Sequence, residues 1–302
     1  MTHHVGYVVV LLAAIMFGLG TVINKMILID VHPLVLGGFV YLLSGLFLIL
    51  LHSILSIKPR YHHLIAPVSA EITLPKENIK IFVLVVVSGV ILAPFFYLYG
   101  LSVTTAVNAS LLINAETLFT ILIAIVLFKE TIKKKDLLAI ILIIVCTIIL
   151  TTNLQAISVD FGVAFYGNVL VLLGTFFWAV DNNFSKILSQ KGDIIHIVSL
   201  KSLCGGSIVL MVSYTLGLPF NFNVLIIVYL LIVGFFSIGL SLILFMLGLK
   251  LIGTTKTSVT FATSSLFGAF FGFFLIKESL SIIQISAGFI MLFGVYLLGK
   301  KV

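Results

Sequence analysis

Long apolar runs alternate with short polar breaks along the whole chain, and the runs are long enough to cross a lipid bilayer as helices. A membrane-spanning helix needs about 20 predominantly apolar residues. The pattern therefore predicts ten membrane helices, at residues 5–28, 34–57, 81–101, 105–128, 136–153, 161–187, 194–216, 224–249, 256–276 and 281–299. The expected fold class is an all-α membrane protein.

The breaks between the runs carry turn residues or charges. DVHP (30–33) and GLPFNFN (217–223) contain residues typical of turns, and KETIKKKD (129–136) is a charged connector. The longest polar segment, 58–80, is predicted to be a cytoplasmic loop. No small-residue cleavage motif follows the first run, so we expect that run to be a retained membrane helix rather than a signal peptide.

Composition supports this interpretation, because 61% of the 302 residues are hydrophobic and only 9% are charged. Soluble domains carry about 25% charged residues. The net charge of +7 then indicates membrane orientation rather than nucleic-acid binding. The sequence has no P-loop, no potassium-channel filter, no zinc-like Cys/His cluster and no convincing Ser-His or paired-Asp arrangement. We expect no cofactor, no metal and no enzymatic activity.

The distribution of lysine and arginine predicts the orientation. With the N-terminus inside, the inner loops and the C-terminus hold most basic residues, the outer side holds only Lys25 and Lys277, and Lys201 lies within a span. Cytoplasmic loops carry an excess of Lys and Arg, so both termini are predicted to be cytoplasmic in a multi-pass protein of the plasma membrane. The expected partners are the bilayer and a small solute, and the expected state is a monomer or a homodimer.

An internal repeat divides the chain into two halves. Residues 100–130 align without a gap on residues 248–278, and both segments end in Lys-Glu. Near the start of each half, FGLGTVINK (17–25) aligns on WAVDNNFSK (178–186). We predict a first repeat at 1–153 and a second at 154–302, each with five membrane helices. Because five is odd, the second repeat enters from the opposite face, and such inverted repeats are characteristic of secondary transporters.

These segments resemble the drug/metabolite transporter superfamily, in its EamA branch. The resemblance covers nearly the whole chain and rests on ten spans in two halves, each closing its fourth span with an LF…KE stretch. It implies alternating access, with the first, third, fourth, sixth, eighth and ninth spans around the solute. The chain departs from the family pattern at Thr117 and Ser265, where proline is usual, and at Lys129 and Lys277, where glycine is usual. The prolines that would bend the fourth and ninth helices are therefore absent.

Polar residues at helical spacing within the spans predict the binding site. An ionisable group at bilayer depth costs about 2.5–3.5 kcal/mol on insertion scales, so Glu116 should face the bundle interior or a water-filled cavity. Helical spacing places Asn108 and Phe119 on the face of Glu116, while Trp178, Asp181 and Asn182 form a second stripe. The predicted solute-binding residues are Glu116, Asn114, Trp178, Asp181, Asn182, Thr263, Ser264, Thr21, Tyr97 and Tyr99. An apolar shell is expected from Phe95, Tyr97, Tyr99, Trp178 and Phe245.

Several polar residues have two interpretations. Glu116 is either a binding or proton-carrying group or a structural carboxylate, and Asp181 either contacts solute or forms a structural ion pair with Lys186 or Lys201. Lys25 and Lys186 are expected to extend toward lipid headgroups. The pairs Lys129/Glu130 and Lys277/Glu278 are expected to mark helix ends at the membrane surface.

The sequence thus predicts a secondary transporter that exports amino acids or similar small polar metabolites by alternating access. Glu116 would bind an ammonium group or carry a proton. Two alternatives stay open: efflux of cationic or lipophilic drugs on the same scaffold, and an intramembrane enzyme or a scaffold that transports nothing. A phosphorylated solute would need several basic side chains at mid-membrane, and only Lys201 lies that deep.

Overall fold

The computed structural model describes residues 2–56, 78–129, 134–152, 162–189, 194–252 and 254–299, which form helices and short connections with no strand among them. The first half contains α1 (Thr2–Ile27), α2 (Pro33–Ser56), α4 (Ile79–Val86), η3 (Val87–Leu92), α5 (Ala93–Val103), α6 (Ala106–Leu112), α7 (Ala115–Phe128) and α8 (Lys134–Thr151). The second half contains α9 (Val163–Ser189), α10 (Ile194–Thr215), α11 (Val224–Leu231), η4 (Ile232–Leu240), α12 (Ser241–Ile252), α13 (Thr254–Ala262), α14 (Ser264–Leu275) and α15 (Ile282–Gly299). The segments η3 and η4 are π-helical.

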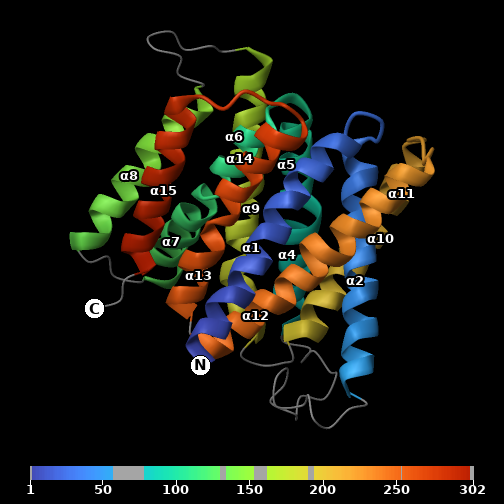
Figure 1. Ribbon diagram of the computed structural model, residues 1–302. Helices are drawn as coiled ribbons and strands as arrows, with labels where there is room; N and C mark the ends of the chain where they lie inside the picture. Colours follow the sequence, from blue (N-terminus) through green and yellow to red (C-terminus); the bar gives the residue numbers. More distant parts are fainter. Residues whose placement is uncertain are drawn as a thin grey trace.

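These elements combine into ten membrane helices, because α4–η3–α5, α6–α7, α11–η4–α12 and α13–α14 are each consecutive segments of one span. In the described part of the chain, eight helices are long and apolar enough to cross a bilayer. The other two, α8 and α15, have shorter apolar stretches and pack against each other at one edge of the bundle (Figure 1). The predicted all-α, ten-helix fold is confirmed.

The start of α1 and the end of α15 lie toward the same end of the bundle (Figure 1). We call the face where α1 begins the N-terminal face and the other the opposite face. Successive spans run in alternating directions, so after five spans α9 begins at the opposite face and the second half is inverted relative to the first. The predicted division between residues 153 and 154 lies outside the described residues and stays a prediction.

The repeat found in the sequence has counterparts in the backbone. Lys129 follows α7 and Lys277 follows α14, and both adopt the left-handed conformation, with φ of 54° and 57°. A side chain makes this conformation costly, whereas glycine adopts it readily. The third and eighth spans each contain a π-helical segment, η3 and η4. Corresponding positions in the two halves therefore share unusual backbone geometry.

The two halves interlock rather than lie side by side. Helix α1 packs against α12 and α14 of the second half, α9 packs against α5 and α7 of the first, and α2 packs against α10. Glycines permit the closest crossings: a Cβ at Gly100 would lie 2.5 Å from the carbonyl oxygen of Gly167, and one at Gly248 would lie 2.1 Å from Val10 Cγ2. Small residues allow such close helix approach in membranes. The first helix of each half is thereby held beside the third and fourth spans of the other.

Candidate functional site

A cavity of about 490 Å³ lies between the two halves. Its volume falls within the range of small-molecule sites, about 300–1,000 Å³. Side chains from α1, α2, α5, α7, α9, α10, α12 and α13 line it. Asn182 and Ser258 line the cavity and are exposed. The fourth span ends at the N-terminal face and the ninth span begins there. Thr120 of α7 and Ser258 of α13 lie toward that face and line the cavity, so the cavity extends between α7 and α13 toward the N-terminal face.

Two of the surrounding helices are broken beside the cavity. In the fourth span, the N–H groups of Asn114, Glu116 and Thr117 donate to carbonyl groups three residues earlier, which separates α6 from α7 by a tight turn. The N–H groups of Thr263 and Leu266 do the same in the ninth span. Both spans are thus interrupted although the family's prolines are absent. Tight turns within a helix often mark functional hinges, and discontinuous helices form the binding sites of many transporters.

Glu116 lies in the first turn of α7 and lines the cavity. Its Oε1 accepts a hydrogen bond from Asn182 Nδ2, and no other side-chain hydrogen bond reaches this carboxylate from the described residues. A carboxylate offers about four acceptor sites on its two oxygens. Glu116 therefore retains acceptor capacity for a solute.

Asp181, in contrast, already has three contacts from Lys201 and Ser185. Lys201 Nζ lies 2.6 Å from Asp181 Oδ2 and 2.9 Å from Oδ1, and Ser185 Oγ donates to Oδ1 at 2.7 Å. Both residues of the ion pair are buried and line the cavity. Of the two partners that the sequence allowed for Asp181, the structure selects Lys201; the side chain of Lys186 lies outside the described residues.

Trp178 is held in place by a carbonyl group of the π-helical segment η3. Its Nε1 donates to the Gly89 carbonyl oxygen at 3.2 Å and to Tyr41 Oη at 3.3 Å. The Ala93 N–H donates to the Ser88 carbonyl, five residues earlier. In the same register, the Gly89 carbonyl would accept from residue 94, which is proline and has no N–H. The π-helical segment thus frees a carbonyl group for Trp178.

Replacing Gly89 with alanine is expected to displace Asp181 and to reduce transport. A Cβ at this position would lie 2.2 Å from Asp181 Oδ2 and 2.8 Å from Asp181 Cβ. Overpacking of this kind typically costs about 1–3 kcal/mol. Gly37→Ala is the matched control, since Gly37 also lines the cavity but its nearest neighbour would be the end of Leu98 at 3.2 Å. Uptake rates and melting temperatures of both variants check the prediction, and equal behaviour of the two would contradict it.

Other polar side chains of the cavity bond mainly to the protein itself. Thr21 Oγ1 and Tyr97 Oη lie 3.0 Å apart, and Asn114 Nδ2 donates to Ser265 Oγ at 2.8 Å, which links the two helix breaks. Asn24 Oδ1 is buried and has no hydrogen-bond partner among the described residues. Asn24 also lines the cavity.

Aromatic rings form an apolar part of the cavity wall. Phe17 and Phe261 have ring centroids 5.4 Å apart, and Phe245 and Phe261 have centroids 4.9 Å apart. All three line the cavity together with Trp178. The cavity therefore combines a charged part, around Glu116, with an aromatic part that can pack against an apolar group.

Most of the residues predicted to bind solute line this cavity: Thr21, Tyr97, Asn114, Glu116, Trp178, Asp181, Asn182 and Ser264. Tyr99 and Thr263 are not among its lining residues. Tyr99 lies about 200° around the helix from Tyr97, and its hydroxyl group lies 3.0 Å from His32 Nε2. The Thr263 hydroxyl donates to the Thr260 carbonyl at 2.6 Å at the helix break.

The stripe predicted on the fourth span is wrong beyond Glu116. Asn108 is buried between helices, where its Nδ2 donates to the Leu150 carbonyl and its Oδ1 accepts from Gln284 Nε2. Phe119 packs against Phe176 on α9. The break between α6 and α7 explains the position of Asn108, because helical periodicity does not continue through it. Phe119 lies in the same helix as Glu116 and turns to α9 instead.

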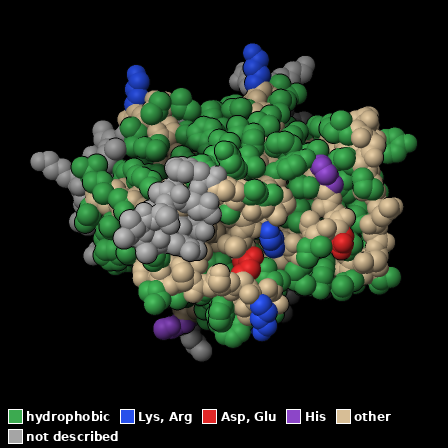
Figure 2. All heavy atoms as spheres, turned by 90° about the horizontal axis from the view of Figure 1, so that it is seen from above, with side chains coloured by type: hydrophobic (Ala, Val, Ile, Leu, Met, Phe, Trp, Pro, Cys, Tyr) green, Lys and Arg blue, Asp and Glu red, His purple; other side chains and the backbone are tan. Residues whose placement is uncertain are grey.

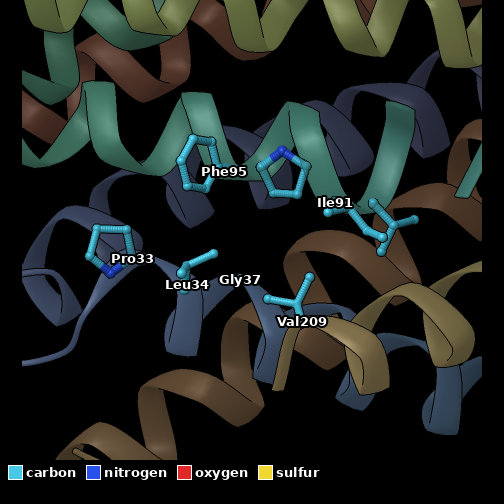
Figure 3. Close-up of a pocket in the computed structure, with 8 residues that line it drawn as sticks. Pro33, Leu34, Gly37, Ile91, Phe95 and Val209 are labelled. Atoms are coloured by element: carbon cyan, nitrogen blue, oxygen red, sulfur yellow. The ribbon is translucent and has the colours of Figure 1, made fainter. Parts of the chain in front are cut away.

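Phe95 was expected in the apolar shell but lies elsewhere. With Pro33, Leu34, Gly37 and Val209 it lines a separate niche between α2, α5 and α10 (Figure 3). The niche holds only about 10 Å³ and its lining is apolar. A single water needs about that much volume and several polar partners, so the niche is a packing gap rather than a solute site.

Lys201 and Tyr41 are cavity residues that the sequence prediction did not include among the binding residues. The depth of Lys201 within its span was the available signal. The Tyr41 hydroxyl gave no signal, because Tyr41 sits alone in an apolar run and gains its role only through contact with Trp178.

Comparisons with known proteins agree with this architecture. The model of the EamA-like transporter family matches the chain twice, at residues 4–152 and 165–300. The chain belongs to the EamA-like transporter family. A curated relative of this EamA-like protein, described as an uncharacterized transporter of Methanothermobacter thermautotrophicus, is 36% identical over 297 residues, covering 97% of this chain and 85% of the relative.

A solved crystal structure, described only as that of a protein, also has this fold. It superposes with a TM-score of 0.66 over 98% of this chain and 96% of its own, at 14% sequence identity. Identity at that level supports the fold alone. Family membership makes the EamA-like protein a multi-pass membrane transporter, and the cavity between its halves is its candidate solute site.

Proposed function

We propose that this EamA-like protein exports small solutes that carry an ammonium group, such as amino acids or similar small polar metabolites, by alternating access. The observation that carries the proposal is the environment of Glu116. Its carboxylate lines the cavity and receives a side-chain hydrogen bond only from Asn182 among the described residues. An ammonium group supplies both the hydrogen-bond donors and the positive charge that such a carboxylate lacks.

The other two charges near Glu116 direct the solute to that carboxylate. Asp181 and Lys201 neutralise each other through two short contacts. Both also interact electrostatically with Glu116. The group of three therefore carries one net negative charge when all are ionised. A carboxylate on the solute would be repelled by Glu116 and attracted by Lys201, which suits a zwitterion placed between them.

Proton coupling is part of the same proposal. When no solute is bound, a proton on Glu116 would remove the uncompensated charge before the cavity closes, since an unpaired ion in a low-dielectric interior is costly. A solute ammonium and a proton would then compete for one carboxylate. With both termini on the cytoplasmic side of the plasma membrane, as the lysine distribution predicts, the cavity extends toward the cytoplasm.

The aromatic part of the cavity favours a second candidate, efflux of cationic or lipophilic drugs. Phe17, Phe245, Phe261 and Trp178 offer faces on which a larger cation can pack. Cation–π contacts contribute about 0.5–2 kcal/mol each. The two candidates share Glu116 and differ in the size and hydrophobicity of the rest of the solute.

Thermal-shift and counterflow measurements on the purified protein test the proposal. We expect stabilisation and exchange by members of an amine-bearing panel of amino acids, and little response to sugars, nucleosides or phosphorylated solutes. Stabilisation by quaternary aromatic amines alone would favour the drug candidate. A response confined to sugars or anions would contradict both candidates.

A further inference from the structure

Glu278 makes a contact that a helix end at the membrane surface does not require. It lies in the connection after α14, where the left-handed Lys277 turns the chain. Its two carboxylate oxygens accept hydrogen bonds from the N–H groups of Ala106, at 2.8 Å, and Val107, at 2.9 Å. These are the first two residues of α6, in the other half of the protein. Glu278 thus caps a helix of the first half from the second half.

The packing between the fourth and ninth spans shows which helices this cap holds together. At the opposite face, α6 and α14 pack directly against each other. Their contact is tight, because a Cβ at Gly268 would lie 2.2 Å from Ser110 Oγ and one at Gly272 would lie 3.1 Å from Val107 Cγ2. Beyond the two helix breaks, α7 and α13 both line the cavity and do not pack against each other as α6 and α14 do. The same two spans are therefore closed at one face and separated toward the other.

Lys25 reinforces the closed face next to Glu278. Its Nζ donates to the carbonyl oxygens of Leu101, Ser102 and Thr104, at 2.7, 3.0 and 2.7 Å, and it interacts electrostatically with Glu278. Lys25 was expected to extend toward the lipid headgroups, but its side chain bonds to these carbonyl groups instead. It caps the end of α5 from the end of α1. A cation at a helix C-terminus and an anion at a helix N-terminus both complement the helix dipoles.

We infer that Glu278 is a gate residue, which holds the opposite face shut through its bonds to the start of α6. We call these bonds the Glu278 gate contact. Figure 2 looks onto this face, where a few charged side chains lie among many hydrophobic ones. Opening toward the opposite face requires the two halves to separate there, so the contact between Glu278 and α6 must break. The inference rests on the proposed alternating access but not on the identity of the solute.

Two single-cysteine reporters test the inference in a protein that lacks Cys146 and Cys204 (Cys146→Ala, Cys204→Ala). The Asn24→Cys reporter probes the part of the cavity beside the closed face, and the Ser258→Cys reporter probes the part toward the N-terminal face. Each is labelled with a membrane-impermeant maleimide in vesicles of both orientations. Asp30→Asn is the matched control, since it removes an exposed carboxylate in the connection between α1 and α2 without touching α6.

Glu278→Gln keeps the size of the side chain but replaces one acceptor oxygen with an NH₂ group that cannot accept from a backbone N–H. It should raise labelling of the Asn24 reporter from the opposite face by about fivefold or more, within the usual range of conformational coupling. It should also lower labelling of the Ser258 reporter from the N-terminal face. Glu278→Asp, which is one methylene shorter, should shift both rates in the same directions by less.

Other labelling outcomes overturn the inference. Unchanged rates at both reporters would mean that the contact does not hold the face closed. Faster labelling at both reporters would mean that Glu278 only stabilises the fold. Because labelling needs no solute, a shift of the two rates in opposite directions would support the gate contact even if the solute panel failed.

Discussion

Replacing Lys201 with methionine is expected to cost about 3–5 kcal/mol of folding free energy, because it leaves the Asp181 carboxylate buried without a counter-charge. Asp181 is 5% exposed and Lys201 is 9% exposed, so water cannot readily replace the missing partner. Lys201 Nζ contacts both oxygens of Asp181, and among the described residues only Ser185 would remain bonded to that carboxylate. The expected result is a large loss of monodisperse protein after heating in detergent, measured by size-exclusion chromatography.

The double variant Asp181→Asn/Lys201→Met provides the control for this prediction. Removing both charges of a buried pair is often nearly neutral for stability, so most of the lost thermal stability should return. A double variant as unstable as Lys201→Met would show that the two side chains act independently, and it would contradict the assignment of their contact as the stabilising interaction.

Replacing Glu116 with glutamine is expected to reduce amine transport by about 10-fold to 150-fold while the protein remains folded. A hydrogen bond to a charged group contributes about 1.5–3 kcal/mol, and each 1.36 kcal/mol corresponds to a factor of ten. Glutamine has almost the same size and still offers an oxygen to Asn182 Nδ2. Uptake of the responsive amine into proteoliposomes measures the effect.

Thr117→Val is the matched control for Glu116→Gln. Thr117 is the neighbouring residue in α7 and lines the same cavity, but it carries no charge. Near-normal uptake by this variant would show that changes in the cavity wall as such are tolerated. Unchanged uptake by Glu116→Gln over a broad pH range would remove Glu116 from both solute binding and proton coupling.

Hydropathy and the repeat predicted the spans, their inversion and many of the cavity residues. These features follow from local pattern, since lipid requires apolar runs of a set length and turns charged groups such as Glu116 inward. Trp178, Asp181 and Asn182 of the second stripe all line the cavity, because α9 is continuous along it.

The sequence did not predict features that depend on contacts between distant residues. The break between α6 and α7 contains no proline, so Asn108 was placed on the wrong face. Lys25 and Glu278 lie at helix ends. From the sequence alone, such a side chain could equally contact lipid headgroups or cap the end of another helix. Only the packing of α1 on α5 and of α14 on α6 distinguishes these partners.

The most direct test of the account compares an amine with its N-acetyl analogue in wild type and in Glu116→Gln by equilibrium binding. Acetylation removes the solute's positive charge, and the variant removes the protein's negative charge, so the four affinities isolate the interaction between them. The account predicts that wild type prefers the amine by about tenfold or more and that this preference nearly disappears in Glu116→Gln. An equal preference in the two proteins would contradict the claim that this carboxylate in the cavity recognises the ammonium group.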